Sequence, residues 1–214
     1  TFIEVDMHED QAQAYRDMSL RLVTILKQAL AMKDSTLLGV VMNVLLAWPD
    51  CCFRMEVVRH PRTKALLYSQ AAIFEEGETS PKEAELLRIC KEEKADGRRV
   101  LAYSVYTGTR DTTARLKTQL EANGLKVAVL RASVDASRRE DWVADQVERG
   151  IDVLICNPEL VKTGLDLLEF PTIVFMQSGY NVYTVQQAAR RSWRNSRRSP
   201  RCSRRRSCRS PRRS

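Results

Sequence analysis

The spacing of apolar residues predicts two helices at the start of the chain. Between residues 8 and 32, apolar residues recur every three or four positions, which is the period of an amphipathic helix. The residues that share this buried face are Tyr15, Met18, Leu22, Ile25, Leu26 and Ala29. A second helix is expected from Thr36 to Trp48, because Pro49 cannot continue it. The segment 50–77 has no clean period and is expected to be irregular or to hold short elements.

After residue 98 the pattern changes to short apolar runs that alternate with helical ones. The expected strands cover 98–105, 126–130, 151–156 and 172–177, and the expected helices cover 111–122, 137–149 and 182–194. The strands are almost continuously apolar, as parallel strands are when helices cover both faces of a sheet. With right-handed crossovers, this order predicts an α/β fold in which a small doubly wound parallel sheet is preceded by a helical segment.

Capping signals mark two helix boundaries in this region. The stretch from Ser80 to Glu83 is a capping box with proline at the first helical position, and Gly97 stands where the C-terminal cap of that helix belongs. Ser137 and Glu140 are expected to form a second capping box at the start of helix 137–149, which a glycine follows.

The positive charge of the chain lies in its C-terminal tail, residues 195–214. The formal net charge is +8, with 35 Lys and Arg against 27 Asp and Glu. The tail holds nine Arg and no acidic residue, so the remainder carries 26 basic and 27 acidic residues. Because the folded part has no positive field of its own, any nucleic-acid binding by it has to come from a few well-placed donors.

Composition also excludes several classes of protein. No apolar run approaches the roughly 20 residues of a membrane span, and no secretion signal opens the chain, so we expect no membrane partner and a cytoplasmic location. The six cysteines form no CxxC pair and only two histidines accompany them, so no metal site is expected. We expect reduced thiols, and the sequence offers no role for Cys51 and Cys52.

Small polar residues and one basic residue follow the expected strands. They are Thr107, Arg131, Ser133 and Asn157. Ligands of an open parallel sheet bind at the carboxyl ends of its strands, where these residues fall. In the loop 156–168, Gly164 and Asp166 could touch a phosphate or a ribose hydroxyl. Turns favour the same residue types, so an ordinary turn is the alternative interpretation for each of them.

The last expected helix carries a stripe of planar donors. Gln187, Arg191 and Arg194 are spaced i, i+4 and i+7 and share one face, whereas Arg190 and Trp193 point elsewhere. Guanidinium groups pair bidentately with phosphate oxygens and keep their charge, so this stripe suits a phosphate chain. A solvated basic face is the alternative.

Together these stretches resemble the second RecA-like lobe of superfamily 2 helicases and translocases, most closely the Swi/Snf-type branch. RRVLAYSVYTGTRD is similar to motif IV of that family and TGLDL to motif V, although the preceding NPELVKTG lacks the usual paired small residues. QAARRSWR is similar to motif VI, whose pattern is Gln, any three residues, Arg, any two residues, Arg. The segment VDMHEDQAQAY is similar to the one that follows the first lobe. The similarity covers about half of the chain.

The resemblance implies a role for each candidate residue. Arg191 and Arg194 would be arginine fingers that stabilise charge on the γ-phosphoryl group of ATP, and Gln187 would help to position them. Gly164 and Asp166 would contact the nucleotide. The residues after the first three strands, Thr107, Arg131, Ser133 and Asn157, would contact the backbone of DNA or RNA.

The motifs of a first lobe are not in the chain. None of the eight glycines is followed by lysine, so there is no GxxxxGK[ST] phosphate loop, and no Asp-Glu pair is present to hold magnesium. We therefore expect that this chain alone binds no cofactor and does not hydrolyse ATP. In an intact parent enzyme, ATP and Mg²⁺ would be held mainly by the first RecA-like lobe, which would be the protein partner of this chain.

Three regions follow from these observations. Residues 1–79 form a helical or irregular lead-in from the junction with the first lobe, 80–194 form the helicase C-terminal domain, and 195–214 form a tail that cannot build a core. The family pattern continues with Ile-Gly-Gln after Arg194, where this sequence has Asn195-Ser196-Arg197. The tail is either an Arg/Ser segment that binds nucleic acid or the product of a shifted reading frame.

One function of a different class stays open from the sequence. A non-catalytic α/β module could bind RNA or a phosphate-bearing ligand through the arginine helix and the basic tail. The sequence also leaves open whether the substrate is DNA or RNA, and whether the parent enzyme separates strands or only translocates.

Overall fold

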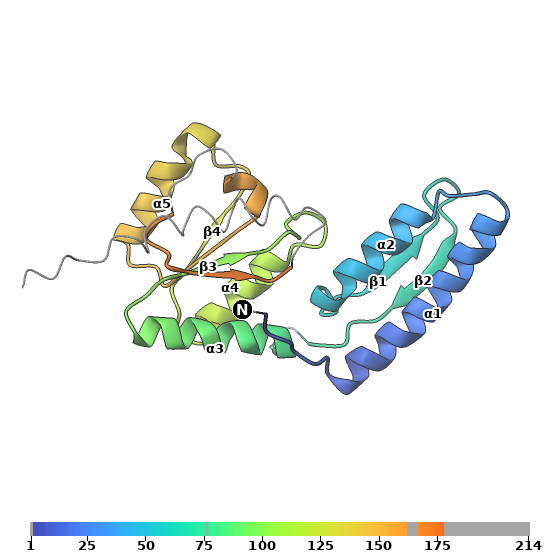
Figure 1. Ribbon diagram of the computed structural model, residues 1–214, viewed down its shortest axis with the longest axis horizontal. Coiled ribbons are helices and arrows are strands. Elements are labelled where there is room, and N and C mark those ends of the chain that lie inside the picture. Colours follow the sequence, from blue (N-terminus) through green and yellow to red (C-terminus); the bar gives the residue numbers. More distant parts are fainter. Residues whose placement is uncertain (1, 76, 162–166, 178–214) are drawn as a thin grey trace, which may run out of the picture.

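The computed structural model of the chain describes residues 2–75, 77–161 and 167–177. It contains two units that lie next to each other (Figure 1). We call residues 2–79 the N-terminal unit and residues 80–177 the sheet domain. Within the described ranges, none of the helices is both long enough and apolar enough to span a membrane.

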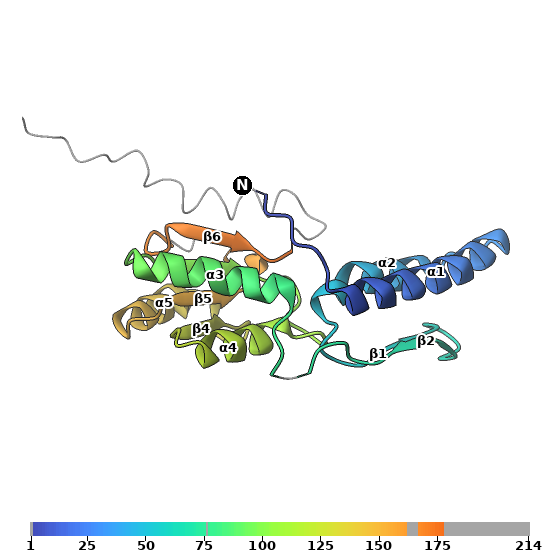
Figure 2. The same cartoon turned by 90° about the horizontal axis from the view of Figure 1, so that it is seen from below.

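The N-terminal unit consists of two helices that cover a β-hairpin. The helices are α1 (Glu9–Ala31) and α2 (Leu38–Ala47), and a 3₁₀ turn, η1 (Trp48–Asp50), follows α2. The hairpin strands β1 (Glu56–Arg59) and β2 (Leu66–Gln70) are antiparallel. Figure 2 shows the helices in one layer and the hairpin in the other. Both expected helices are confirmed, and the short elements expected within 50–77 are this hairpin.

The predicted apolar stripe of α1 forms the core of the N-terminal unit. Its buried residues pack against α2, η1 and the hairpin. The buried residues of this core are Met18, Leu22, Leu26, Ala29, Leu37, Val41, Val44, Trp48, Cys52, Val58 and Phe74. Cys51 is buried as well, and burial raises the pKa of both Cys51 and Cys52 to about 12. These two thiols are therefore unreactive packing residues at neutral pH.

The sheet domain has the predicted alternation of strands and helices. Its elements are α3 (Pro81–Ala95), β3 (Val100–Tyr103), α4 (Thr112–Ala122), β4 (Val127–Leu130), η2 (Ala136–Arg138), α5 (Arg139–Glu148), β5 (Val153–Cys156), η3 (Pro158–Val161) and β6 (Thr172–Phe175). The strand order is β4-β5-β3-β6, and every pairing is parallel. This is the expected α/β sheet, preceded by a largely helical unit.

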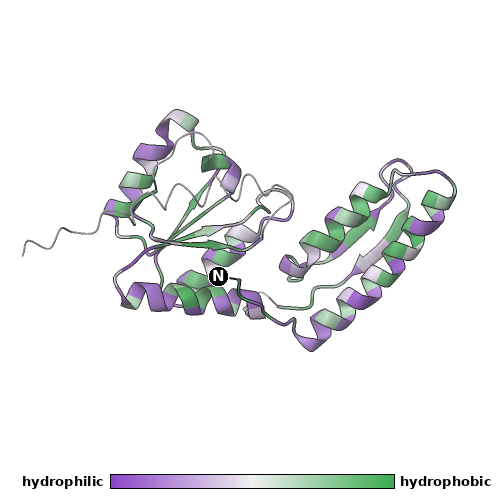
Figure 3. Cartoon of the chain, in the orientation of Figure 1, coloured by the Kyte–Doolittle hydropathy of each residue, from purple (hydrophilic) through white to green (hydrophobic). Residues whose placement is uncertain are grey.

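Successive residues of each strand enter two different cores. Leu101 and Tyr103 of β3 face the side that α5 covers, whereas Val100 and Ala102 face α3 and α4. Figure 1 shows α3 and α4 on one side of the sheet and α5 on the other. In Figure 3 the strands are hydrophobic and the outer sides of the helices are polar. Burial on both faces explains why the strands are almost continuously apolar.

One of the two predicted capping boxes is present. The Ser80 amide donates to the Glu83 carboxylate at 2.8 Å, and the Glu83 amide donates to the Ser80 hydroxyl at 3.4 Å. Gly97 has a φ of 71°, as a left-handed helix cap requires. The predicted capping box, the proline at the first helical position and the glycine after the helix are all confirmed.

The second predicted capping box is wrong. Ser137 lies inside η2, and α5 begins at Arg139. The Asp135 carboxylate accepts the backbone N–H of Ser137 at 2.9 Å and its hydroxyl at 2.5 Å. The Ser137 hydroxyl is therefore a donor to Asp135, and Asp135 caps the helical segment two residues earlier than predicted. The same hydrogen bonds lower the pKa of Asp135.

Candidate nucleic-acid interface

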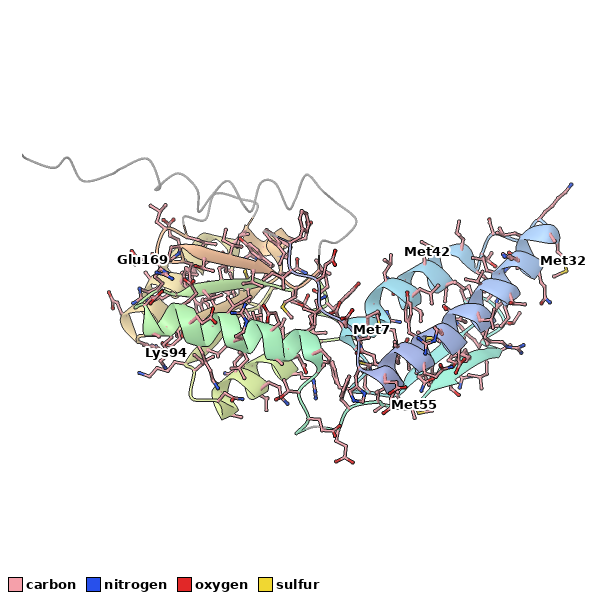
Figure 4. All side chains as sticks on the ribbon, turned by 60° about the horizontal axis from the view of Figure 1, so that its bottom comes forward. Met7, Met32, Met42, Met55, Lys94 and Glu169 are labelled. Carbon is pink, nitrogen blue, oxygen red and sulfur yellow. The ribbon has the colours of Figure 1, made fainter. Side chains whose placement is uncertain are left out.

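Four of the nine predicted site residues lie in the described part of the chain, at the carboxyl ends of β3, β4 and β5. They are Thr107, Arg131, Ser133 and Asn157. The other five, Gly164, Asp166, Gln187, Arg191 and Arg194, lie outside the described residues. The carboxyl ends of β3 and β6 point toward the N-terminal unit (Figure 1). Lys94 and Glu169, labelled in Figure 4, mark the opposite end of the sheet domain.

Asn157 and Thr107 are brought together across the edge of the sheet. The Asn157 side-chain amide donates to the Thr107 hydroxyl at 3.3 Å and to the Val105 carbonyl at 3.2 Å. Its carbonyl oxygen accepts the Glu159 amide at 2.9 Å, which starts η3. The Thr107 hydroxyl accepts this hydrogen bond and keeps its own proton as a donor.

Arg131 is paired with a residue that the sequence did not single out. Its guanidinium donates to the Asp111 carboxylate at 2.8 Å, and the Arg131 side chain is 46% exposed. Asp111 also caps α4 by accepting the Thr113 amide at 3.0 Å. Burial raises the pKa of Asp111, but hydrogen bonds from Thr113 and Arg131 outweigh that effect, and the net pKa is lowered. Ser133 is exposed in the turn after β4, outside this pair.

Gln177, two residues after β6, is a further polar residue at a strand end of this edge, for which the sequence predicts no contact with a ligand. Its side-chain carbonyl accepts the Val105 amide at 3.0 Å and the Ser104 hydroxyl at 3.2 Å. Gln177 thereby joins the end of β6 to the end of β3. Its place after a strand follows the same rule that selected Asn157.

The edge therefore presents the Thr107 hydroxyl and the partly exposed Arg131 guanidinium, while the Asn157 amide holds the loop after β3 in place. Donors of this kind bind phosphate oxygens and sugars, and they carry no base specificity. Among the described residues, no group of three His, Cys, Asp or Glu side chains is placed to hold a metal ion. The four cysteines of the same ranges are buried and free.

The fold and this edge define the class of protein, a RecA-like α/β lobe with a polar carboxyl edge. The profile of the helicase conserved C-terminal domain matches residues 81–196, which is more than half of the chain. The chain belongs to that family and is a C-terminal lobe of a superfamily 2 helicase or translocase.

A solved structure has the same fold. The crystal structure of the C-terminal part of the Fun30 ATPase domain matches with a TM-score of 0.50 and 20% sequence identity. The match covers 56% of this chain and 38% of that one. At this identity the likeness concerns the fold alone. No curated protein matches the sequence significantly.

Proposed function

We propose that this chain supplies the second lobe of an ATP-dependent translocase and that the carboxyl edge of its sheet binds the nucleic-acid backbone. The proposal rests on membership of the helicase C-terminal family. The observations that carry it further are the pairing of Asn157 with Thr107 and the half-exposed Arg131 at the end of β4. Contacts to phosphate and sugar would fix the lobe on the strand without reading its sequence.

Arg131 can serve this purpose because its present ion pair is weak. Partly exposed ion pairs contribute about 0–1 kcal/mol, so a phosphate can replace the Asp111 carboxylate at small cost. The Thr107 hydroxyl needs no rearrangement, since Asn157 already occupies its acceptor side. The edge would hold the phosphate backbone of DNA or RNA.

The ATP-dependent part of the proposal concerns residues outside the described ranges. Arg191 and Arg194 would reach the γ-phosphoryl group of an ATP held with Mg²⁺ by the first lobe, and Gln187 would orient them. Gly164 and Asp166 would contact the same nucleotide. Closure of two lobes over ATP would then be coupled to movement along the strand that the sheet edge holds.

The proposed binding of nucleic acid by the sheet edge is tested with a matched pair of arginine variants. The full chain is prepared with the nine tail arginines replaced by glutamine, so that the tail does not mask the edge. Arg131→Ala is compared with Arg98→Ala, whose side chain is 45% exposed and is ion-paired with Glu93 at 2.6 Å. Arg98 precedes β3, at the opposite end of the sheet.

Binding of a labelled oligonucleotide is measured over a range of salt concentrations. We expect Arg131→Ala to lower the slope of log K against log salt by about 0.7 for a single strand, which is the loss of one phosphate contact. Arg98→Ala should leave the slope unchanged. Equal slopes for both variants and the parent would contradict the proposed interface.

A further inference from the structure

The N-terminal unit holds the loop that follows β3 through a buried ion pair. Arg110 donates to both oxygens of Glu56, at 2.6 Å and 3.2 Å. The Glu56 side chain is 6% exposed and the Arg110 side chain 19% exposed. This two-point pairing connects β1 of the N-terminal unit to a loop 54 residues later in the chain.

Two more side chains of the N-terminal unit reach the same loop. The Asn43 side-chain carbonyl of α2 accepts from Arg110 at 2.5 Å. Arg54 donates to the backbone carbonyl of Thr109. Asn43 of α2 and Glu56 of β1 therefore hold Arg110, and Arg54, in the turn before β1, holds Thr109.

A third connection reaches the beginning of the loop. Asp50 accepts a hydrogen bond from the Gln177 side chain and one from Lys82 at 2.8 Å. Gln177 in turn accepts the Val105 amide at 3.0 Å. The N-terminal unit thus contacts the loop 105–111 directly at Thr109 and Arg110, and its beginning through Gln177.

This loop needs support because its sequence favours no single conformation. Tyr106-Thr107-Gly108-Thr109 contains no apolar anchor at its tip, and Gly108 and Thr109 are exposed. A Thr-Gly-Thr segment has many backbone conformations to lose, and contacts made by neighbouring side chains offset that entropy. The contacts at Thr109 and Arg110 begin two residues after Thr107, the proposed backbone contact.

We propose that the N-terminal unit is a positioning device for the nucleic-acid interface, in which Glu56 acts through Arg110 to hold Thr107 in place. This inference rests on the proposed function for its purpose. Glu56 is a positioning residue, since its carboxylate is buried against Arg110 and is therefore not available to a ligand. The position of the loop 105–111 thereby depends on a unit that lies outside the family match at residues 81–196.

The test measures the loop directly, by hydrogen–deuterium exchange in the full chain with the tail arginines replaced. Glu56→Gln keeps the shape of the side chain and removes its charge, and Asn43→Ala removes the second partner of Arg110. Glu92→Gln is the matched control, because Glu92 pairs with Arg88 at 2.6 Å on an exposed part of α3. We expect faster exchange in residues 105–112 for the first two variants, with β4 and α5 unchanged, and no difference for the control.

Oligonucleotide binding by the same variants separates the inference from the proposed function. Glu56→Gln should weaken binding about three- to tenfold, the effect of one misplaced hydrogen-bond donor. Unchanged exchange in residues 105–112, with weaker binding by Arg131→Ala, overturns the positioning role and leaves the interface standing. If exchange is faster but neither Glu56→Gln nor Arg131→Ala weakens binding, the proposed interface is overturned, and the positioning role falls with it.

Discussion

Glu83 of α3 and Arg115 of α4 form a two-point ion pair in the interior of the protein. The distances are 2.6 Å and 3.1 Å, and the side chains are 10% and 8% exposed. The Arg115 guanidinium also lies 4.7 Å from the centre of the Phe53 ring and donates to the carbonyl of Glu75 at 3.3 Å and to that of Glu78. The Arg115 side chain thus links α3 and α4 to Phe53, Glu75 and Glu78 of the N-terminal unit.

Removal of this guanidinium should destabilise the whole chain. Arg115→Ala leaves the Glu83 carboxylate buried without its charge partner, and we expect a loss of about 3–5 kcal/mol in the free energy of unfolding. The measurement is urea denaturation. Arg88→Ala is the control, because Arg88 makes its ion pairs with Glu85 and Glu92 on the surface and should matter little. Similar losses for the two variants would show that the buried pair has no special weight.

Asp50 should make stability fall as the pH rises. Burial raises its pKa despite the attraction of Lys82, so the folded state holds the proton more tightly than the unfolded state does. The stability that this group contributes is present at low pH and is lost as the pH rises through the raised pKa. Asp50→Asn should remove that loss, so that the variant gains stability relative to the parent as the pH increases.

The matched comparison is Asp34, whose pKa shifts in the opposite direction. Hydrogen bonds from the Thr36 side chain and backbone lower the pKa of Asp34, so its contribution is lost as the pH falls. Unfolding free energies of Asp50→Asn and Asp34→Asn, measured from about pH 4 to about pH 7, should therefore diverge from the parent in opposite ways. A parallel pH dependence for Asp50→Asn and the parent would contradict the buried charge at Asp50.

The four described cysteines should resist thiol reagents in the folded protein. Burial raises the pKa of Cys51, Cys52 and Cys90 to about 12 and also raises that of Cys156. With Cys202 and Cys208 replaced by serine, we expect negligible labelling at neutral pH and four labelled thiols after denaturation. Rapid labelling of a native thiol at the rate of a free cysteine would disprove this assignment.

Replacement of Asp111 should strengthen nucleic-acid binding without a large cost in stability. Asp111→Asn keeps the N-cap of α4, because Asn and Asp cap helices about equally well, and we expect a change below about 1 kcal/mol in unfolding. The variant also releases Arg131 and removes a negative charge next to it. Tighter oligonucleotide binding, measured by fluorescence anisotropy, is the expected result, and weaker binding would mean that Arg131 does not face the strand.

The sheet could be predicted from sequence, whereas the hairpin of the N-terminal unit could not. Strand β3 is apolar at every position because both of its faces are covered, so its sequence pattern agrees with its burial. In β1, Glu56 is buried and Val57 is exposed, which inverts the usual pattern. The inversion depends on Arg110, 54 positions away, which neutralises the buried carboxylate. No local pattern can reveal such a distant partner.

The candidate site could likewise be predicted from the sequence only in part. The strand-end rule brought Thr107 and Asn157 to one edge, and the structure joins them by a hydrogen bond. The rule could not show that Arg131 is paired with Asp111, or that Gln177 links two strand ends, because both facts depend on the three-dimensional packing of separate loops. The predictions for Gly164, Asp166, Gln187, Arg191 and Arg194 stay predictions.

The most direct test of the central claim is ATP hydrolysis by a protein that joins this chain to a first RecA-like lobe. Arg191→Ala and Arg194→Ala are compared with Arg190→Ala, whose side chain is expected on a different face of the helix. If the chain is the second lobe of a translocase, the first two variants lose nucleic-acid-stimulated turnover by on the order of 10³-fold while ATP binding is kept, and the third stays close to the parent. Unchanged turnover for Arg191→Ala and Arg194→Ala would contradict the account.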